Sequence, residues 1–371
     1  MIQTLYNLDE ITLIPAKIST IKSRSSCDTR YGDKLPIFVS PMACLTNKDN
    51  VDTYRELGIN AIIPRTVPFC HRVVKLTQGY WVAVGFREAM YLYNEWSQQI
   101  KKSGRLSYVP YLCIDQAQGH LEDLLKLCKD LKYLLGKTGI VLMTGNIANP
   151  DAYYEYAIHG VDYVRVSVGT GHGCTTSCQT GFHYPMGSLL TEINKIRKEV
   201  KRDLLSGALF DGSIYTEPKV VADGGLHINA QIIKALALGA DYVMLGEIIG
   251  KSEEACGVKC LLDEEWDDVE DDYVEKNGRL YYGMSTERAQ KEINEASLYR
   301  DPQWEPKRSE GIVKIIPIEY KLKDWLTDLD TDLRSAMSYA NATNLNEFIG
   351  KVRWAIISHD SYMKFMGKVI K

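Results

Sequence analysis

Residues 220–246 read VVADGGLHINAQIIKALALGADYVMLG and contain the clearest structural signal in this sequence. An apolar run is followed by an acidic residue and two glycines, then by a helical pattern from Asn229 to Leu238, and then by a second apolar run that ends at Gly246. Continuous rather than alternating hydrophobicity is typical of strands that are buried on both faces of a parallel sheet. This stretch therefore predicts a strand–helix–strand unit of an α/β protein.

The same alternation extends over most of the chain. Eight short apolar runs rich in β-forming residues occur in all, and helical patterns at 50–57, 121–135 and 151–159 separate several of them. Eight strands alternating with helices favour a single (β/α)8 barrel, the TIM-barrel fold, which takes about 250 residues. An open, doubly wound parallel sheet is the alternative, because it also buries its strands on both faces. The predicted strands are Pro36–Ser40, Ile59–Ile63, Tyr80–Val84, Tyr108–Ile114, Gly139–Met143, Tyr163–Val168, Lys219–Ala222 and Tyr242–Leu245.

We expect residues 1–371 to form one catalytic barrel domain. The barrel core spans about 36–250, and 251–371 supply an insertion after the eighth strand, an active-site loop and a C-terminal extension with a helical pattern from Leu322 to Leu333. The insertion contains the acidic block 263–275, DEEWDDVEDDYVE. Runs of like charge are usually solvated, so we interpret this block as a mobile insertion, with an ion site as the alternative.

Composition excludes several classes of protein. With 45% hydrophobic and 25% charged residues, the chain can bury a core and is unlike a disordered protein. Its 44 Lys and Arg against 48 Asp and Glu leave no basic excess to neutralise a nucleic acid. No apolar run reaches the roughly 18 residues of a membrane span, and the N-terminus lacks the features of a signal peptide. We therefore expect a cytoplasmic protein with reduced cysteines that binds neither nucleic acid nor membranes.

The densest chemical signal is the segment 168–185, VGTGHGCTTSCQTGFHYP. Its glycines allow tight turns whose amides and carbonyls can hold a phosphate or a monovalent cation. Cys174 ends this turn just past a predicted strand and is followed by the hydroxyls of Thr175 and Thr176. A cysteine held among backbone amides can serve as a nucleophilic thiolate. The alternative for Cys174 is an inert structural cysteine.

A zinc site is a further alternative for the cysteines. Four thiolates can hold structural zinc, and the chain carries two pairs with the spacing C-x3-C. Against this, the first pair lies in the loop rich in glycine and threonine, and neither pair has the commoner two-residue spacing. The four cysteines are Cys174, Cys178, Cys256 and Cys260.

A phosphate site is expected after the last two strands. Asp223, Gly224 and Gly225 follow the seventh predicted strand, and Gly246 follows the eighth. Barrels commonly bind phosphate with these two loops, where glycines let backbone amides approach the oxygens. Asp223 is then placed to accept hydrogen bonds from ribose hydroxyls. A turn with no ligand is the alternative.

On these motifs, the chain resembles the IMP dehydrogenase and GMP reductase family over nearly its full length. The resemblance implies the (β/α)8 barrel, a homotetramer and a thioimidate formed between the loop cysteine and C2 of a purine nucleoside monophosphate. The strings that carry it are DEITLIP (9–15), GTGHGCTT (169–176) and ADGGLHINAQIIKALALGADYVMLG (222–246).

Within this family, the sequence is more similar to the reductases. Only 64–79 separate the second and third predicted strands, where dehydrogenases usually carry a regulatory pair of CBS domains. The resemblance thus implies NADPH-dependent reductive deamination of GMP to IMP and ammonia. Strings similar to the reductases are IKSR (21–24), CIDQAQG (113–119), TGFHYP (180–185), NGRLYYGMST (277–286) and RSEG (308–311).

Three other functions stay open. The first is an IMP dehydrogenase without CBS domains that uses NAD and converts IMP to XMP; the Tyr299-Arg300 pair lies in a segment long enough for such an enzyme's mobile flap. The second is a related enzyme that acts on a deoxy or modified purine nucleotide. The third is a non-catalytic nucleotide-binding paralogue.

The resemblance also assigns roles to residues. Cys174 is the expected nucleophile, and Thr176 and Glu310 are expected to move protons. K⁺ is expected at backbone carbonyls of Gly169, Gly171 and Cys174. The expected substrate-binding residues are His172, Asp223, Gly224, Gly225, Gly246, Glu247, Gly283, Met284, Ser285, Arg308, Ser309 and Gly311. The expected cofactor-binding residues are Ser23, Arg24, Arg65, Asp115, Gln116 and Ala117, with Ser335 and Ser338 reaching the cofactor from a neighbouring subunit.

Four positions depart from the family pattern, one of them Gly173, which stands where the family has a branched residue. His172 stands where the family has a serine that contacts the nucleotide phosphate, and Ala43 stands where it has an aspartate. Glu247 follows Gly246, where the family has a small residue near the phosphate. A carboxylate there repels a phosphate dianion unless it is paired, and a protonated His172 is the expected partner.

Overall fold

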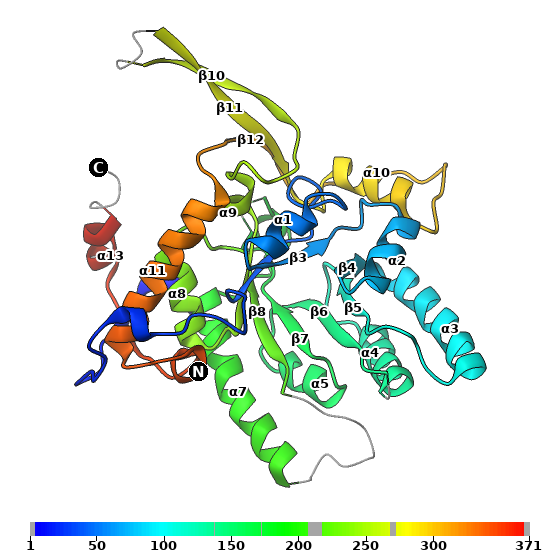
Figure 1. Ribbon diagram of the computed structural model, residues 1–371, viewed down its shortest axis with the longest axis horizontal. Helices are drawn as coiled ribbons and strands as arrows, with labels where there is room; N and C mark the ends of the chain where they lie inside the picture. The colour runs from blue at the N-terminus through cyan, green and yellow to red at the C-terminus, as the bar shows by residue number, and fades with distance from the viewer. Residues whose placement is uncertain (1–3, 137, 172, 207–216, 268–271, 367–371) are drawn as a thin grey trace.

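Eight parallel strands close into a barrel in the computed structural model, which describes residues 4–136, 138–171, 173–206, 217–267 and 272–366 (Figure 1). The order follows the chain, and the last strand pairs with the first, with Ile37 opposite Val243 and Val39 opposite Leu245. The predicted barrel is therefore confirmed, and the open sheet is wrong because the sheet has closed. The barrel strands are β2 (Ile37–Val39), β3 (Asn60–Ile63), β4 (Trp81–Val84), β5 (Tyr111–Asp115), β6 (Val141–Ile147), β7 (Tyr163–Val166), β8 (Lys219–Asp223) and β9 (Tyr242–Leu245).

Helices surround the barrel and bury one face each. In α4, for example, Leu124, Leu127 and Leu131 are buried at helical spacing against the strands. The helices predicted at 50–57, 121–135, 151–159 and 229–238 are present, whereas α2, α3, α6 and α7, among the helices that precede β9, were not predicted. The helices up to β9 are α1 (Val51–Glu56), α2 (Phe69–Thr77), α3 (Phe86–Ser103), α4 (Glu122–Leu135), α5 (Ala152–Ile158), α6 (Thr176–Thr180), α7 (Met186–Ser206) and α8 (Asn229–Leu238).

A three-stranded antiparallel sheet follows the barrel. It contains β10 (Lys259–Asp267), β11 (Asp272–Tyr282) and β12 (Val313–Pro317), and its hairpin extends away from the barrel in Figure 1. The described part of the acidic block lies in the paired strands β10 and β11, with Glu264 opposite Glu275, and its mobility stays a prediction. Trp, Val and Tyr residues within the block favour extended structure despite its charge.

The two ends of the chain meet beside the barrel. β1 (Ile11–Ile14) pairs with β13 (Arg353–Ile356), and α11 (Leu322–Ala340) contacts α8. The helix predicted from Leu322 therefore continues to Ala340 and ends at Asn341, whose φ of +56° is left-handed. The remaining elements are the short 3-10 helices η1 (Leu8–Glu10) and η2 (Arg24–Ser26) and the helices α9 (Glu247–Gly250), α10 (Glu287–Ala296), α12 (Leu345–Phe348) and α13 (His359–Met366). No helix in the described residues is long and apolar enough to cross a membrane.

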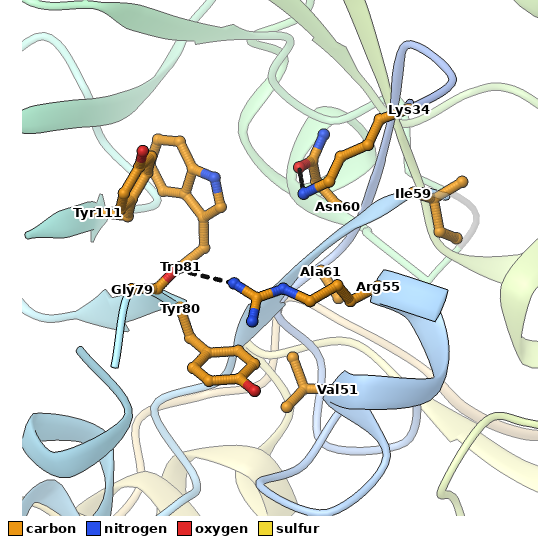
Figure 2. Close-up of a pocket in the computed structure, with 10 residues that line it drawn as sticks. All are labelled: Lys34, Val51, Arg55, Ile59, Asn60, Ala61, Gly79, Tyr80, Trp81 and Tyr111. Carbon is orange, nitrogen blue, oxygen red and sulfur yellow. Dashed lines mark hydrogen bonds between the residues drawn. The ribbon is translucent and has the colours of Figure 1, made fainter. Parts of the chain in front are cut away.

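Aromatic side chains fill the N-terminal end of the barrel. Phe38 contacts the rings of Trp81 and Tyr242, with centroids 5.5 and 5.2 Å away. A cavity of about 140 Å³ lies at the same end (Figure 2), where Lys34 donates to Asn60 and Arg55 donates to the Gly79 carbonyl. Because these polar groups already have protein partners, this end of the barrel is built for packing.

Candidate active site

The residues expected to carry chemistry gather at the opposite end of the barrel. Asp115 is the last residue of β5, Asp223 is the last of β8, and Gly246 directly follows β9. The carboxyl ends of parallel strands meet on one face, which is where barrel enzymes place their sites. The barrel thus brings together side chains that lie far apart in the sequence.

The cysteine loop is held in place by a second segment of the chain. The amide of Cys174 donates to the carbonyl of Gly171 at 2.9 Å and closes a tight turn. The Thr175 amide then donates to the carbonyl of Glu310 at 2.8 Å, and the Ile312 amide donates to the carbonyl of Gly173 at 3.0 Å. This short antiparallel pairing fixes the loop against 309–312.

A hydrogen-bonded chain links Cys174, Thr176 and Glu310. The Sγ atom of Cys174, which is half-buried, lies 3.2 Å from Thr176 Oγ1. Thr176 Oγ1 in turn donates to Glu310 Oε2 at 2.7 Å. A hydroxyl that both donates and accepts can pass a proton between a thiol and a carboxylate. The three residues named from the sequence as catalytic therefore lie in one contact series.

The two glycine-rich loops after β7 and β8 touch each other. Gly224 and Gly225 have φ of +93° and +71°, which side-chain-bearing residues rarely adopt. A Cβ atom on Gly224 would lie 3.1 Å from the Cα of Gly171, so the close approach also requires glycine. The DGG loop and the cysteine loop thus form one continuous backbone surface.

The segment around Gly283 completes this surface. A Cβ atom on Gly283 or on Gly311 would lie 3.1 or 2.9 Å from the carbonyl oxygen of Gly173. The Glu310 amide donates to the carbonyl of Ser285 at 3.4 Å, and Ser309 Oγ donates to the carbonyl of Gly311. Met284 packs against the core, whereas Arg308 is exposed to solvent.

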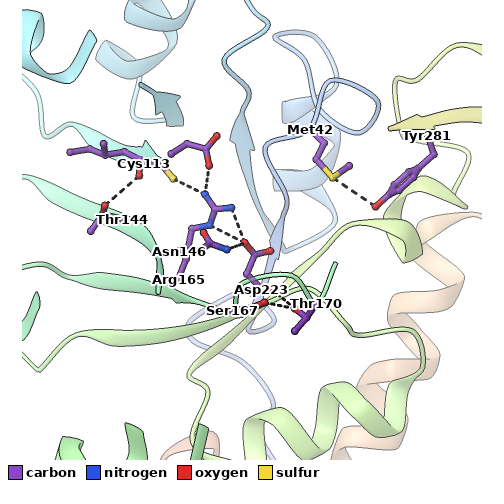
Figure 3. A network of polar contacts seen from close by, with 11 residues as sticks. Met42, Cys113, Thr144, Asn146, Arg165, Ser167, Thr170, Asp223 and Tyr281 are labelled. Carbon is purple, nitrogen blue, oxygen red and sulfur yellow. Dashed lines mark hydrogen bonds and ion pairs between the residues drawn. The ribbon is translucent and has the colours of Figure 1, made fainter. Parts of the chain in front are cut away.

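A buried arginine, missed in the sequence analysis, joins two of the expected binding residues. Arg165 of β7 pairs with Asp115 at 2.5 Å and with Asp223 at 2.8 Å, and Asn146 donates to the same Asp223 oxygen (Figure 3). Burial alone would lower the pKa of Arg165, but the two carboxylates raise it, so the guanidinium stays charged. A charged residue inside an apolar strand was the available sequence signal.

Glu247 also has a partner that the sequence did not reveal. Lys314 Nζ of β12 lies 3.0 Å from Glu247 Oε2. His172 lies outside the described residues, so its expected pairing with Glu247 stays a prediction. Tyr281, missed as well, places its hydroxyl 2.8 Å from the position that a Cβ atom of Gly246 would take. Burial, reinforced by neighbouring acidic groups, raises the pKa of Tyr281, which therefore stays a hydrogen-bond donor.

The expected cofactor residues fall into two groups. In the first, Arg65 Nη1 donates to the carbonyl of Asp115 at 3.3 Å, while Arg65 Nε is buried without a hydrogen-bond partner. Gln116 and the exposed Ala117 continue this loop after β5. The unsatisfied donor fits a site that a polar ligand completes.

The second group lies elsewhere in the subunit. Arg24 donates to Ser335 Oγ at 2.9 Å, and Ser338 Oγ donates to the carbonyl of Ser335. Ser23 caps η2, which contacts α11 beside α8, away from β5 in Figure 1. The chain by itself therefore does not bring the two groups together, and the contribution of Ser335 and Ser338 from a neighbouring subunit stays a prediction.

The described cysteines are not arranged as a metal centre. All nine cysteines are free thiols, and no group of three or more His, Cys, Asp or Glu residues is placed to hold a metal ion in the described part of the chain. This finding argues against a four-cysteine zinc site; Cys256, for instance, donates to the carbonyl of Ala43. The carbonyls of Gly169 and Gly171 already accept from Ser177 Oγ and the Cys174 amide. The K⁺ site stays a prediction.

Fold and site together define an α/β-barrel protein with a cysteine loop and glycine-rich ligand loops at the carboxyl end of its strands. The family model for the IMP dehydrogenase / GMP reductase domain matches residues 95–364, and the chain belongs to this family. It is 26% identical to a GMP reductase of Staphylococcus carnosus over 96% of this chain and 98% of that protein. GMP reductases of Helicobacter pylori and Enterococcus faecalis are each 27% identical over the same shares.

Proposed function

We propose that this protein is a GMP reductase-like enzyme that converts GMP to IMP and ammonia with NADPH. The observation that carries the proposal is the contact series Cys174–Thr176–Glu310 beside the two glycine-rich loops. Relatives named GMP reductase that align over nearly the whole chain support it. The proposal extends to a cytoplasmic homotetramer.

Cys174 is the nucleophile in this proposal. Its thiol proton passes through Thr176 to Glu310, and the thiolate adds to C2 of the guanine ring. The same relay returns a proton to the 2-amino group, which leaves as ammonia and leaves a thioimidate on Cys174. A hydride supplied to C2 would let the C–S bond break with Cys174 thiolate as the leaving group, and the thiolate would recover a proton from solution. The balanced reaction consumes GMP, NADPH and two protons and yields IMP, NADP⁺ and ammonium.

The remaining residues bind and orient. We assign the ribose hydroxyls to Asp223, which Arg165 and Asn146 hold in place, and the phosphate to the loops that contain Gly225 and Gly246. Arg65 and Asp115 are the residues that would hold NADPH, since Arg65 Nε has no protein partner. When bound, the nicotinamide supplies the hydride.

The segment proposed as a dehydrogenase flap is anchored outside the site. Arg87 of α3 lies over the ring of Tyr299, 4.7 Å from its centroid, and Ser297 Oγ donates to Glu88 at 3.3 Å. A flap that enters the site to activate water must leave such contacts. This favours the reductase over the dehydrogenase.

Nicotinamide absorbance tests the proposal. The protein is incubated with GMP and NADPH, with IMP and NAD, and with deoxy-GMP and NADPH. We expect NADPH oxidation with GMP, release of ammonia, and no turnover in Cys174→Ala. NAD reduction with IMP instead identifies a dehydrogenase, a preference for deoxy-GMP identifies the modified-substrate enzyme, and nucleotide binding without turnover in any mixture identifies a paralogue. Turnover that persists in Cys174→Ala overturns the mechanism.

A further inference from the structure

We propose that Lys314 is a substrate-binding residue that holds the 5′-phosphate of the purine nucleotide, and that Glu247 is the positioning residue that holds Lys314. This inference rests on the proposed function, since it concerns the substrate of the same site. The positive charge that offsets Glu247 at the phosphate site then comes from Lys314 of β12, in the three-stranded sheet outside the barrel.

The topology brings Lys314 to the expected phosphate end of the barrel. Gly246 follows β9, and Glu247 is the next residue along the chain. In the antiparallel pair β11–β12, Lys314 is directly opposite Tyr281. Residues directly opposite each other share one face of a sheet, so Lys314 and Tyr281 point to the same side.

Four groups meet in this corner. Lys314 Nζ lies 3.0 Å from Glu247 Oε2 and 5.5 Å from the centroid of the Tyr281 ring. A Cβ atom on Gly246 would lie 2.8 Å from the Tyr281 hydroxyl, so a larger residue there would force Tyr281 to shift. The side chains of Lys314 and Glu247 are 23% and 14% exposed, which leaves the pair reachable from solvent but held in one geometry.

The charges explain why a lysine is needed. Glu247 by itself would repel a phosphate dianion. Arg165 does not offset this charge, because it is already paired with Asp115 and Asp223. An ammonium group has three donors. Lys314 uses one donor on Glu247 and can direct the others to phosphate oxygens. Glu247 thus holds Lys314 in position, but its negative charge weakens the binding of the phosphate dianion.

Opposite effects of two substitutions test this inference. Binding of GMP and of guanosine, which lacks the phosphate, is measured by titration calorimetry for the wild type, Lys314→Met and Glu247→Gln. A charge-assisted contact predicts that Lys314→Met weakens GMP binding by about 10- to 100-fold and leaves guanosine binding within about twofold. Glu247→Gln removes the repelling charge, so GMP binding should tighten by about two- to fivefold while guanosine binding stays the same.

Two further variants separate binding from folding. Lys314→Arg keeps the charge and should retain most of the affinity for GMP. Lys251→Met breaks the Lys251–Glu319 pair, also 3.0 Å long, at the base of the same sheet and should bind GMP like the wild type. Equal thermal midpoints of Lys314→Met and Lys251→Met would show that the loss is not a folding defect.

The outcomes are distinguishable. Equal weakening of GMP and guanosine in Lys314→Met, or no weakening at all, overturns the role of Lys314. Tighter binding of guanosine than of GMP by the wild type also overturns it, since the Glu247–Lys314 pair would then exclude phosphate. A wild type that binds neither ligand overturns the proposed function and this inference with it, whereas a selective loss of GMP affinity supports both.

Discussion

The hydroxyl of Thr176 donates a 2.7 Å hydrogen bond to the carboxylate of Glu310, a residue 134 positions further along the chain. The contact depends on the backbone pairing of Thr175 with Glu310, which holds the carboxylate over the cysteine loop. A nucleophile, a hydroxyl and a carboxylate in series form a path for a proton. Each residue of this path is therefore expected to contribute to turnover.

Removing either end of the path should slow the chemical step. We expect Glu310→Gln and Thr176→Val each to lower kcat by about 100- to 10,000-fold with little change in KM for GMP, the usual range for a lost general acid or base. Steady-state kinetics with GMP and NADPH measure this. Thr180→Val is the matched control, since Thr180 also lies in α6 but its hydroxyl donates to the carbonyl of Thr176 and accepts from the amide of Phe182, outside the proton path. A kcat in Glu310→Gln equal to that of Thr180→Val would contradict the relay.

The sequence predicted the barrel because its signal is local. Every strand from β2 to β9 overlaps a predicted apolar run, although β6 continues to Ile147 beyond the predicted end at Met143, and the αβ alternation then defines the architecture. By contrast, α3 was missed, although Ala89, Leu92 and Trp96 are buried at helical spacing, because polar residues dominate the helix. In such a helix, packing against the barrel outweighs composition.

The site residues also differ in whether the local sequence could predict them. Cys174 and Thr176 are neighbours in sequence, so their association was readable from the loop, but Glu310 entered only through a family resemblance. Arg165 carried a signal as a charged residue inside an apolar strand, but the partners of Arg165, Tyr281 and Lys314 could not be predicted, because each partner lies on a separate strand or loop. Contacts between distant strands exist only once the chain has folded.

Arg165 should couple the binding of the two substrates. It joins Asp115 to Asp223, so Arg165→Lys, which cannot make both sets of contacts, should raise KM for GMP and for NADPH together, each by about tenfold. Arg197→Lys is the control, because Arg197 makes a similar pair with Asp241 at the N-terminal end of the barrel. We expect Arg197→Lys to lower the thermal midpoint without changing either KM. A change in only one KM in Arg165→Lys would contradict the coupling.

Phe38 should be a stability residue without a role in turnover. It is 1% exposed among Trp81, Tyr163 and Tyr242, at the end of the barrel remote from Cys174. Phe38→Ala leaves a cavity there and should lower the free energy of unfolding by about 3–5 kcal/mol, measured by urea denaturation. Ile18→Ala, at a side chain that is 72% exposed, should change it by less than about 0.5 kcal/mol. If Phe38→Ala has a lower kcat than the wild type at a low temperature at which the variant is still folded, the N-terminal end of the barrel also affects the active site.

The buried pair of Arg72 and Glu88 should make stability depend on pH. Arg72 Nη2 lies 2.7 Å from Glu88 Oε1, with side chains 0% and 5% exposed. Burial alone would raise the pKa of Glu88, but the hydrogen bonds and charge of Arg72 lower it below the usual value of 4.5. A lowered pKa in the folded state means that ionised Glu88 stabilises the fold fully above pH 4.5 and that this stabilisation is lost as the pH falls further.

Glu88→Gln tests the sign of this dependence. The variant leaves Arg72 buried without a counter-charge, so it should be less stable than the wild type by about 3–5 kcal/mol at pH 7. The difference should narrow as the pH falls through the acid range, because the wild type then protonates Glu88 as well. Thermal midpoints between neutral and acidic pH measure it, with Glu122→Gln as the control, since the Glu122–Lys126 pair is exposed and solvent screens its charges. A difference that stays constant over this range would mean that packing of the side chain, and not its charge, stabilises the fold.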